Sequence, residues 1–191
     1  MAAPAKRKSK MARIALCREN DLGAIAVADA VRERRGGSFL KMDLLMLHSP
    51  TFTKGWNDFS RMLIADLSLP TRLSQFVMCV IGIANEVDYQ VISHAPRFLA
   101  AGGRQAQLDA LKDMPATFAD EALFDQQERA AARLAFEMTR NVQVQDDTFQ
   151  AAVDAFESSE NIVDLVGLIA AYNMVSRFVA AFDIQAEHGR L

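Results

Sequence analysis

The imidazole of His94 is the one ionisable ring in the sequence that lies among apolar and aromatic residues at helical spacing. Gln90 precedes it by four positions and Arg97 follows it by three, so a helix would place all three side chains on nearly one face. Gln75 could approach from a preceding antiparallel helix. An unperturbed imidazole has a pKa near 6.5, which suits it to exchange a proton at physiological pH. His94 is therefore the first candidate for chemistry.

The elements that must position this residue are predicted to be helices. Apolar residues recur at three- and four-residue spacings over most of the chain, and β-branched residues do not alternate with polar ones. A stretch containing Met114-Pro115 is expected to be a connection. The predicted helices span Asp21–Arg34, Leu40–Leu47, Thr53–Leu67, Thr71–Ala84, Glu86–Ala101 with Asn85 as its cap, Asp125–Arg140, Thr148–Phe156 and Ser159–Phe182.

Two of these helices are apolar around most of their circumference. Thr71–Ala84 leaves little polar face and is expected to be buried on nearly every side. Ser159–Phe182 is more apolar than one subunit can comfortably cover, which favours a homo-oligomer.

Composition narrows the class of protein. The chain has 191 residues, of which 51% are hydrophobic and 24% charged, with a net charge of −3. These values predict one globular domain, residues 13–185, between a disordered basic tail (1–12) and a C-terminal tail (186–191). Neither a nucleic-acid motif, a secretory signal nor a membrane span is recognised, so a cytoplasmic protein is expected. Cys17 and Cys79 match no metal or redox spacing and are expected to be reduced thiols.

Three stretches of the chain carry a resemblance to a known family. The first runs from Arg35-Gly36-Gly37 through His48-Ser49-Pro50 to Gly55-Trp56. The second runs from Leu69-Pro70-Thr71-Arg72-Leu73-Ser74-Gln75 through Tyr89-Gln90 to His94-Ala95-Pro96, and the third is Leu168 to Phe178. Over roughly residues 20–184, the sequence resembles the carboxymuconolactone decarboxylase and alkyl hydroperoxidase D (AhpD) family.

The resemblance implies an AhpD-like multi-helix fold whose central helices pack against neighbouring subunits, commonly in trimers or hexamers. One branch of the family reduces peroxides with a cysteine pair, and a cysteine-free branch decarboxylates γ-carboxymuconolactone. Here Val87 and Gln90 stand at the cysteine positions, and Gln75 stands at the position of an acid. Among the family's ionisable groups at these positions, only His94 is kept, which places the chain nearer the cysteine-free branch.

The leading hypothesis is a decarboxylase-like enzyme acting on a small acid or lactone. His94 would handle the proton, while Gln75 or Gln90 would donate hydrogen bonds to the developing enolate. Tyr89 would line the pocket, and Arg97 or Arg72 would hold a substrate carboxylate. No cofactor is implied, and no metal is expected because His, Asp and Glu do not cluster at ligand spacing.

Two alternatives remain open. A non-catalytic helical oligomer could use the same pocket to bind a small acid or nothing, with His94 as a hydrogen-bonded core residue. A thiol peroxidase would require Cys17 or Cys79 to lie beside His94. The other histidines, His48 and His188, are expected at a helix end and in the C-terminal tail.

Overall fold

The structure, a computed structural model, describes residues 12–186, and these residues form helices and turns with no strand among them. The all-α prediction is confirmed. Apart from Ala12 and Ala186, both predicted tails lie outside the described residues. In chain order the helices are the 3-10 helix η1 (Glu19–Ala24) and the α-helices α1 (Ala26–Arg34), α2 (Lys41–Met46), α3 (Pro50–Ala65), α4 (Thr71–Ala84), α5 (Asp88–Ala100), α6 (Gln105–Ala110), α7 (Met114–Ala119), α8 (Gln126–Asn141), α9 (Asp146–Ala155) and α10 (Ser159–Phe182).

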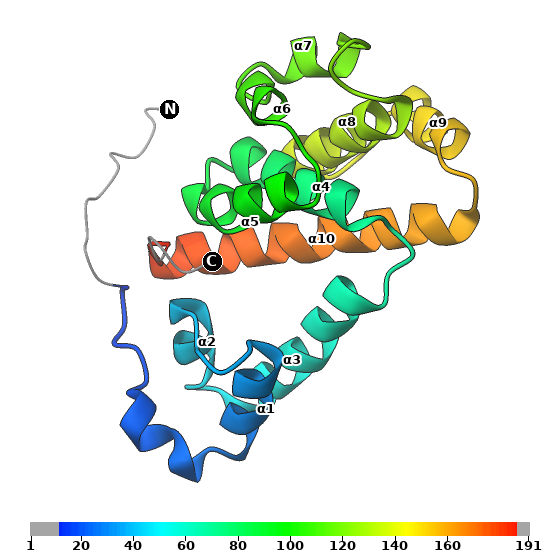
Figure 1. The fold of residues 1–191 in the computed structure, drawn as a ribbon. Coiled ribbons are helices and arrows are strands. Elements are labelled where there is room, and N and C mark those ends of the chain that lie inside the picture. The colour runs from blue at the N-terminus through cyan, green and yellow to red at the C-terminus, as the bar shows by residue number, and fades with distance from the viewer. Residues whose placement is uncertain (1–11, 187–191) are drawn as a thin grey trace.

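The long helix α10 runs through the middle of the molecule and separates two groups of helices (Figure 1). Helices α1 to α3 lie on one side of α10, and α4 to α9 lie on the other. A cluster of buried side chains joins the two groups through α10: Met42 of α2 and Trp56 of α3 pack with Tyr89 of α5 and Val175 of α10. The surface between the two groups is therefore built from segments far apart in the sequence.

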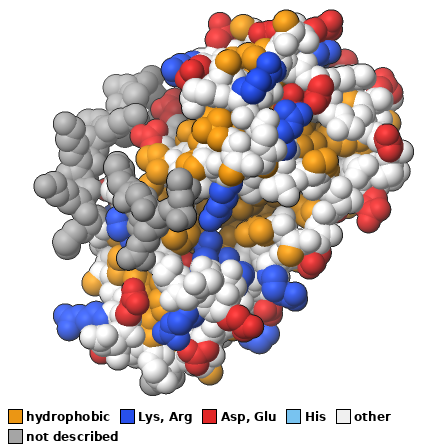
Figure 2. Space-filling view, viewed as in Figure 1, with side chains coloured by type: hydrophobic (Ala, Val, Ile, Leu, Met, Phe, Trp, Pro, Cys, Tyr) orange, Lys and Arg blue, Asp and Glu red, His pale blue; other side chains and the backbone are white. Residues whose placement is uncertain are grey.

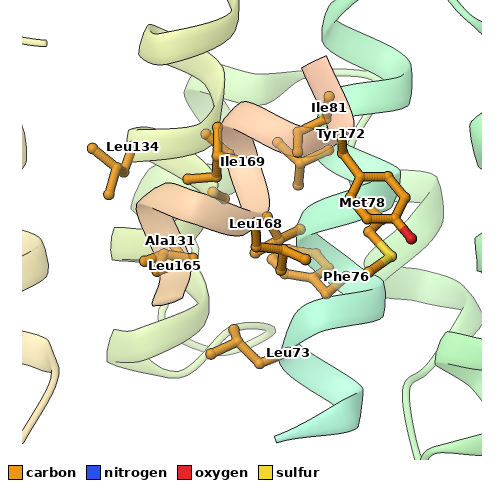
Figure 3. Close-up of a cluster of buried hydrophobic side chains, with 14 of the residues drawn as sticks. Leu73, Phe76, Met78, Ile81, Ala131, Leu134, Leu165, Leu168, Ile169 and Tyr172 are labelled. Atoms are coloured by element: carbon orange, nitrogen blue, oxygen red, sulfur yellow. The ribbon is translucent and has the colours of Figure 1, made fainter. Parts of the chain in front are cut away.

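Helix α4 is the most deeply buried part of the chain. Its residues 76 to 81 are completely inaccessible to solvent, because α5, α8 and α10 all pack around it. Burial of apolar side chains of this size stabilises a fold by about 1.5 to 3 kcal/mol each. Figure 3 shows this core, where Phe76 and Ile81 of α4 lie among Leu134 of α8 and Leu168 of α10, with Tyr172 at its edge.

The predicted limits of α4 and α10 are confirmed, but α5 begins later than predicted. Asn85 ends α4 instead of capping α5, and Glu86 takes a left-handed backbone conformation with φ of 57°. The amide of Val87 donates to the carbonyl of Gly82, which closes the end of α4 as in a Schellman motif. This turn brings α5 back along α4.

The connection predicted around Met114-Pro115 is wrong, because it contains α6 and α7. Both have only six residues, too few for an apolar periodicity to show in the sequence. The side chain of Asp113 accepts a hydrogen bond from the amide of Ala116 and starts α7, with Pro115 in its first turn.

Among the described helices, α10 is long and apolar enough to cross a membrane, but half of its most apolar stretch is buried within the chain. A core helix of a globular protein has the same composition. Its outer face exposes Val163 and Met174. That further subunits bury this face of α10 stays a prediction.

Replacing Gly82 with Ala is expected to destabilise the protein by about 1 to 3 kcal/mol, because α4 and α5 have no room for the added methyl group. A Cβ atom at Gly82 would lie 2.9 Å from Cβ of Gln90 and 3.2 Å from the backbone nitrogen of Val91. The unfolding free energy from urea titration measures the effect.

The matched control is Gly55→Ala in α3, where an added Cβ meets no atom within 4 Å. This substitution removes a helix-interior glycine and should raise the unfolding free energy by about 0.5 to 1 kcal/mol. Equal effects of the two substitutions would show that the α4–α5 contact is not tight.

Candidate functional site

His94 and Gln75 meet where α5 packs on α4. The imidazole Nδ1 lies 2.8 Å from Oε1 of Gln75, and both side chains are buried. An amide oxygen can only accept a hydrogen bond, so Nδ1 carries the proton and donates it. The other ring nitrogen, Nε2, makes no hydrogen bond with the described residues and holds a lone pair. The arrangement fixes the tautomer of His94.

The surroundings of His94 disfavour its charged form. Burial lowers the pKa of His94 to about 3, and the positive charges of Arg97 and Arg35 act in the same direction. The expectation of an ordinary pKa near 6.5 is therefore wrong, because the sequence showed neither the depth of burial nor the approach of Arg35. At neutral pH the imidazole is uncharged and acts as a hydrogen-bond acceptor at Nε2.

The phenol ring of Tyr172 stands edge-on to the imidazole. The two ring centroids are 5.1 Å apart, and the ring planes meet at 80°. Burial raises the pKa of Tyr172 to about 12, so its hydroxyl stays protonated. Tyr172 thus contributes a neutral wall beside His94.

A cavity of about 70 Å³ lies beside these residues, between the two groups of helices. That volume holds a few water-sized groups. Its lining includes three arginines and contains neither Asp nor Glu. The lining residues are Arg34, Arg35, Leu40, Met42, Trp56, Ser60, Ile64, Tyr89, Gln90, Ile92, Ser93, His94, Arg97, Tyr172 and Val175.

A wider surface groove of about 530 Å³ adjoins the cavity and shares its three arginines. Figure 2, in the orientation of Figure 1, shows Lys or Arg side chains in the middle of the face, where the two groups of helices meet. A ligand approaching through this groove meets the same positive charge as it does inside the cavity.

A single buried carboxylate holds two of the arginines in place. Asp43 accepts hydrogen bonds from Nε and Nη2 of Arg35 at 2.8 and 3.0 Å and from Nη2 of Arg34 at 3.2 Å. Arg34 also donates to the side chain of Asn57. Arg97 is exposed and has no ion pair with the described residues. Asp43 therefore offsets the charge of only one of the three guanidinium groups that line the cavity, and the cavity keeps an excess of positive charge.

The predicted site residues are only partly gathered here. Tyr89, Gln90, His94 and Arg97 line the cavity, and Gln75 lies behind His94 and lines the adjoining groove. The amide of Gln90 is already engaged: its nitrogen donates to the carbonyl of Tyr172, and its oxygen accepts from Ser176, both at 2.8 Å. Gln90 therefore ties α5 to α10.

Arg72 lies apart from the cavity. Its guanidinium is paired with Asp125 at 3.1 Å and with Glu128 at 2.9 Å, which ties the start of α4 to the start of α8. Its role in the structure is this connection between helices, and we leave it out of the site.

Most of the cavity residues were not predicted from the sequence, among them Arg34, Arg35, Trp56 and Tyr172. Arg34 and Arg35 come immediately before Gly36-Gly37, where φ values of 72° and 108° turn the chain out of α1. The Gly36-Gly37 stop predicts that the two arginines lie at a helix end, but nothing in the sequence showed that this end lies beside α5.

The two thiols do not join the site. Cys79 is fully buried in the core, where desolvation raises its pKa to about 12, and burial with the charge of Asp21 raises the pKa of Cys17. Neither residue lines the cavity. Within residues 12–186, no three His, Cys, Asp or Glu side chains are grouped to hold a metal ion.

The low pKa of His94 predicts a pH dependence of stability. The unfolded chain takes up a proton on this residue below about pH 6.5, whereas the folded chain does so only near pH 3. Proton binding therefore favours unfolding in this window. The unfolding free energy of the parent, relative to that of His94→Gln, should fall by up to about 1.4 kcal/mol per pH unit as pH decreases.

Urea unfolding of both proteins between about pH 7 and pH 4 measures this difference. The other titrating groups are common to both and cancel. A difference that does not change with pH would mean that His94 is not held neutral.

No protein-family model and no curated protein sequence matches the chain. Solved structures match it over most of its length. A variant of the debrominase Bmp8, in complex with 2,3,4-tribromopyrrole, is 18% identical with a TM-score of 0.77, over 92% of each chain. A peroxidase-related protein from Silicibacter sp. TM1040 is 14% identical with a TM-score of 0.73, over 97% of this chain and 96% of its own.

A third match is described as an alkylhydroperoxidase AhpD core, an uncharacterized peroxidase-related protein from Ralstonia eutropha JMP134. It is 16% identical with a TM-score of 0.74, over 94% of each chain. Likeness at such low identity establishes the architecture of the chain and not its chemistry. The protein therefore has the all-helical AhpD-like fold.

Proposed function

We propose that the protein is an enzyme in which His94 transfers a proton to or from a small organic acid bound in the cavity. The reaction class that we favour is decarboxylation of a carboxylated lactone or a related acid. One observation carries this proposal: a neutral imidazole with a free Nε2 lines a small cavity that has three arginines and no acidic residue.

The charge of the cavity supports an anionic ligand. Asp43 neutralises only part of the charge of Arg34 and Arg35, and Arg97 has no ion pair with the described residues. Guanidinium groups bind carboxylates strongly and with defined geometry. A bound anion would provide the negative charge that the described residues around the cavity lack.

Binding of an anion also affects His94. Its pKa is lowered first by burial and then by Arg97 and Arg35. A ligand carboxylate near these two arginines would offset their charges and raise the pKa of the imidazole. His94 would then take up a proton when an anionic ligand binds. Nε2 is the atom that would carry this proton, because Nδ1 is held by Gln75.

The decarboxylation step then balances. The bond between the carboxyl group and its carbon breaks, CO2 leaves, and the electron pair spreads into the lactone carbonyl as an enolate. The protonated Nε2 of His94 gives its proton to carbon and returns to the neutral form. The arginines would stabilise the enolate oxygen. They replace Gln90 in this role, because its amide is already hydrogen-bonded within the protein.

Thiol peroxidase chemistry is less well supported. A nucleophilic cysteine needs a lowered pKa, whereas the pKa values of Cys17 and Cys79 are raised. A small-molecule ligand is consistent with one structural neighbour, the debrominase Bmp8, which was solved with a brominated pyrrole. A non-catalytic binding protein is the remaining alternative.

The proposal is tested with a panel of carboxylated lactones and β-keto acids, followed by CO2 release. His94→Gln should lower kcat/KM for the best substrate by at least about a hundredfold, the usual scale for a lost acid-base group. The matched control is His48→Gln, since His48 is exposed and its ring contacts the carbonyl of Ala15 away from the cavity.

A His94→Gln variant as active as the parent would exclude His94 as the proton carrier. If the parent releases no CO2 from any member of the panel, the decarboxylase assignment fails and the binding protein is favoured.

Arg97→Gln is expected to raise KM for the same substrate by roughly tenfold or more, because a charge-assisted hydrogen bond to the ligand is lost. Arg61→Gln in α3 is the matched control, since Arg61 is also exposed and without an ion pair among the described residues but does not line the cavity. Equal changes in KM would mean that the effect is one of net charge alone.

A further inference from the structure

Trp56 lines the cavity and carries a buried polar group for which the described residues provide no hydrogen-bond partner. It lies in α3, lines the cavity and is 7% exposed. Its indole nitrogen is buried and has no hydrogen-bond partner among the described residues. Trp56 is also the only tryptophan of the chain.

A buried donor without an acceptor is unfavourable, and native structures rarely leave one. The indole N–H is donor only, so its partner must be an acceptor such as a carbonyl or ether oxygen. Because Trp56 lines the cavity, an occupant of the cavity, a water molecule or a ligand atom, can supply such an acceptor.

The neighbouring polar side chains on α3 offer no free hydrogen-bond donor to the cavity. Ser60, one helical turn after Trp56, donates its hydroxyl hydrogen to the backbone carbonyl of Asn57 at 3.2 Å. Asn57, whose side-chain oxygen accepts from Arg34, does not line the cavity. The indole N–H is therefore the uncommitted donor on the α3 side of the cavity, among the residues that the structure describes.

The positive groups of the cavity come from other elements. Arg34 and Arg35 stand at the end of α1, and Arg97 stands in α5 beyond His94. An anionic group is held best by these arginines, because a guanidinium–carboxylate contact is stronger than a neutral hydrogen bond. The cavity thus offers two different recognition features, a cationic one and a neutral donor.

We propose that the ligand has two matching features, an anionic group at the arginines and a neutral oxygen acceptor that receives the indole N–H of Trp56. This inference rests on the proposed function only for the location of the site. Trp56 would then be a substrate-contacting residue that selects oxo acids and lactone acids over simple aliphatic acids of equal size.

The test compares matched pairs of small acids in which a ketone oxygen replaces a methyl group. The oxo acids are 4-oxopentanoate, 5-oxohexanoate and 6-oxoheptanoate, and their partners are 4-methylpentanoate, 5-methylhexanoate and 6-methylheptanoate. The three lengths cover different separations between the carboxylate and the acceptor. Binding is followed by NMR on the full 15N-labelled chain, in which a single indole N–H signal reports Trp56.

At least one oxo acid should bind about fivefold or more tightly than its methyl partner, the scale of one net hydrogen bond. At saturation it should also move the indole proton downfield, whereas its partner should not. The absence of both effects in every pair, including failure of every acid to bind, would overturn the proposal and leave water as the partner of the indole.

Trp56→Phe removes the N–H and keeps an aromatic ring. The preference for the oxo acid should disappear in this variant, while the methyl acid should bind as it does to the parent, measured by calorimetry. A preference that survives would show that another group reads the oxygen. If the variant does not fold, the indole signal of the parent still distinguishes a ligand acceptor from water.

The outcome is independent of turnover. If the parent releases no CO2 but binds an oxo acid more tightly than its methyl partner through Trp56, the proposed function alone is overturned. If CO2 release depends on His94 but Trp56 confers no preference for an oxo acid, this inference alone is overturned.

Discussion

The close packing of α5 on α4 is the contact on which the site depends. It requires the absence of a side chain at Gly82, and it starts from the turn in which Glu86 takes a left-handed conformation. Because the helices approach so closely, the two side chains of the His94–Gln75 pair lie at hydrogen-bond distance inside the core. The same burial removes water from the imidazole and keeps it neutral. Tautomer, charge and position of the ring all follow from one helix contact.

The group formed by α1 to α3 carries two of the three arginines of the cavity, and Arg97 of α5 is the third. Helices α1 and α2 meet through Asp43, and this carboxylate carries two arginines to the rim of the cavity. The contacts with two guanidinium groups offset much of the hydration that the buried carboxylate loses. They also leave a surplus of positive charge next to a neutral histidine, and this arrangement favours the binding of an anion.

Long apolar helices were the part of the fold most accessible from sequence. Both limits of α4 and of α10 follow from their apolar periodicity, and α8 begins at Gln126, one residue after the predicted start, with Asp125 as its N-cap. The short helices α6 and α7 could not be predicted, because six residues are too few to show a helical period. The start of α5 was predicted two residues too early, because the left-handed position after α4 is occupied by Glu86 and not by a glycine, which would have indicated a helix end.

For the candidate site, sequence spacing could identify the pair on the α4–α5 contact and the arginine that follows His94 on its own helix. It could not identify Arg34, Arg35 or Trp56, which reach the cavity only through the way the chain folds back across α10. Arg72 stood in a suggestive motif, yet it pairs with Asp125 and Glu128. Position along one helix is predictable from periodicity, whereas proximity between distant helices is not.

The single tryptophan has a practical consequence of its own. Indole emission changes with the polarity and the quenching groups around the ring. In this protein all tryptophan fluorescence comes from one residue that lines the cavity. The signal carries no background from other sites. The unmodified protein is thereby an optical sensor of its own cavity, and a chemical library can be screened against it without labels, substrates or an assay of turnover.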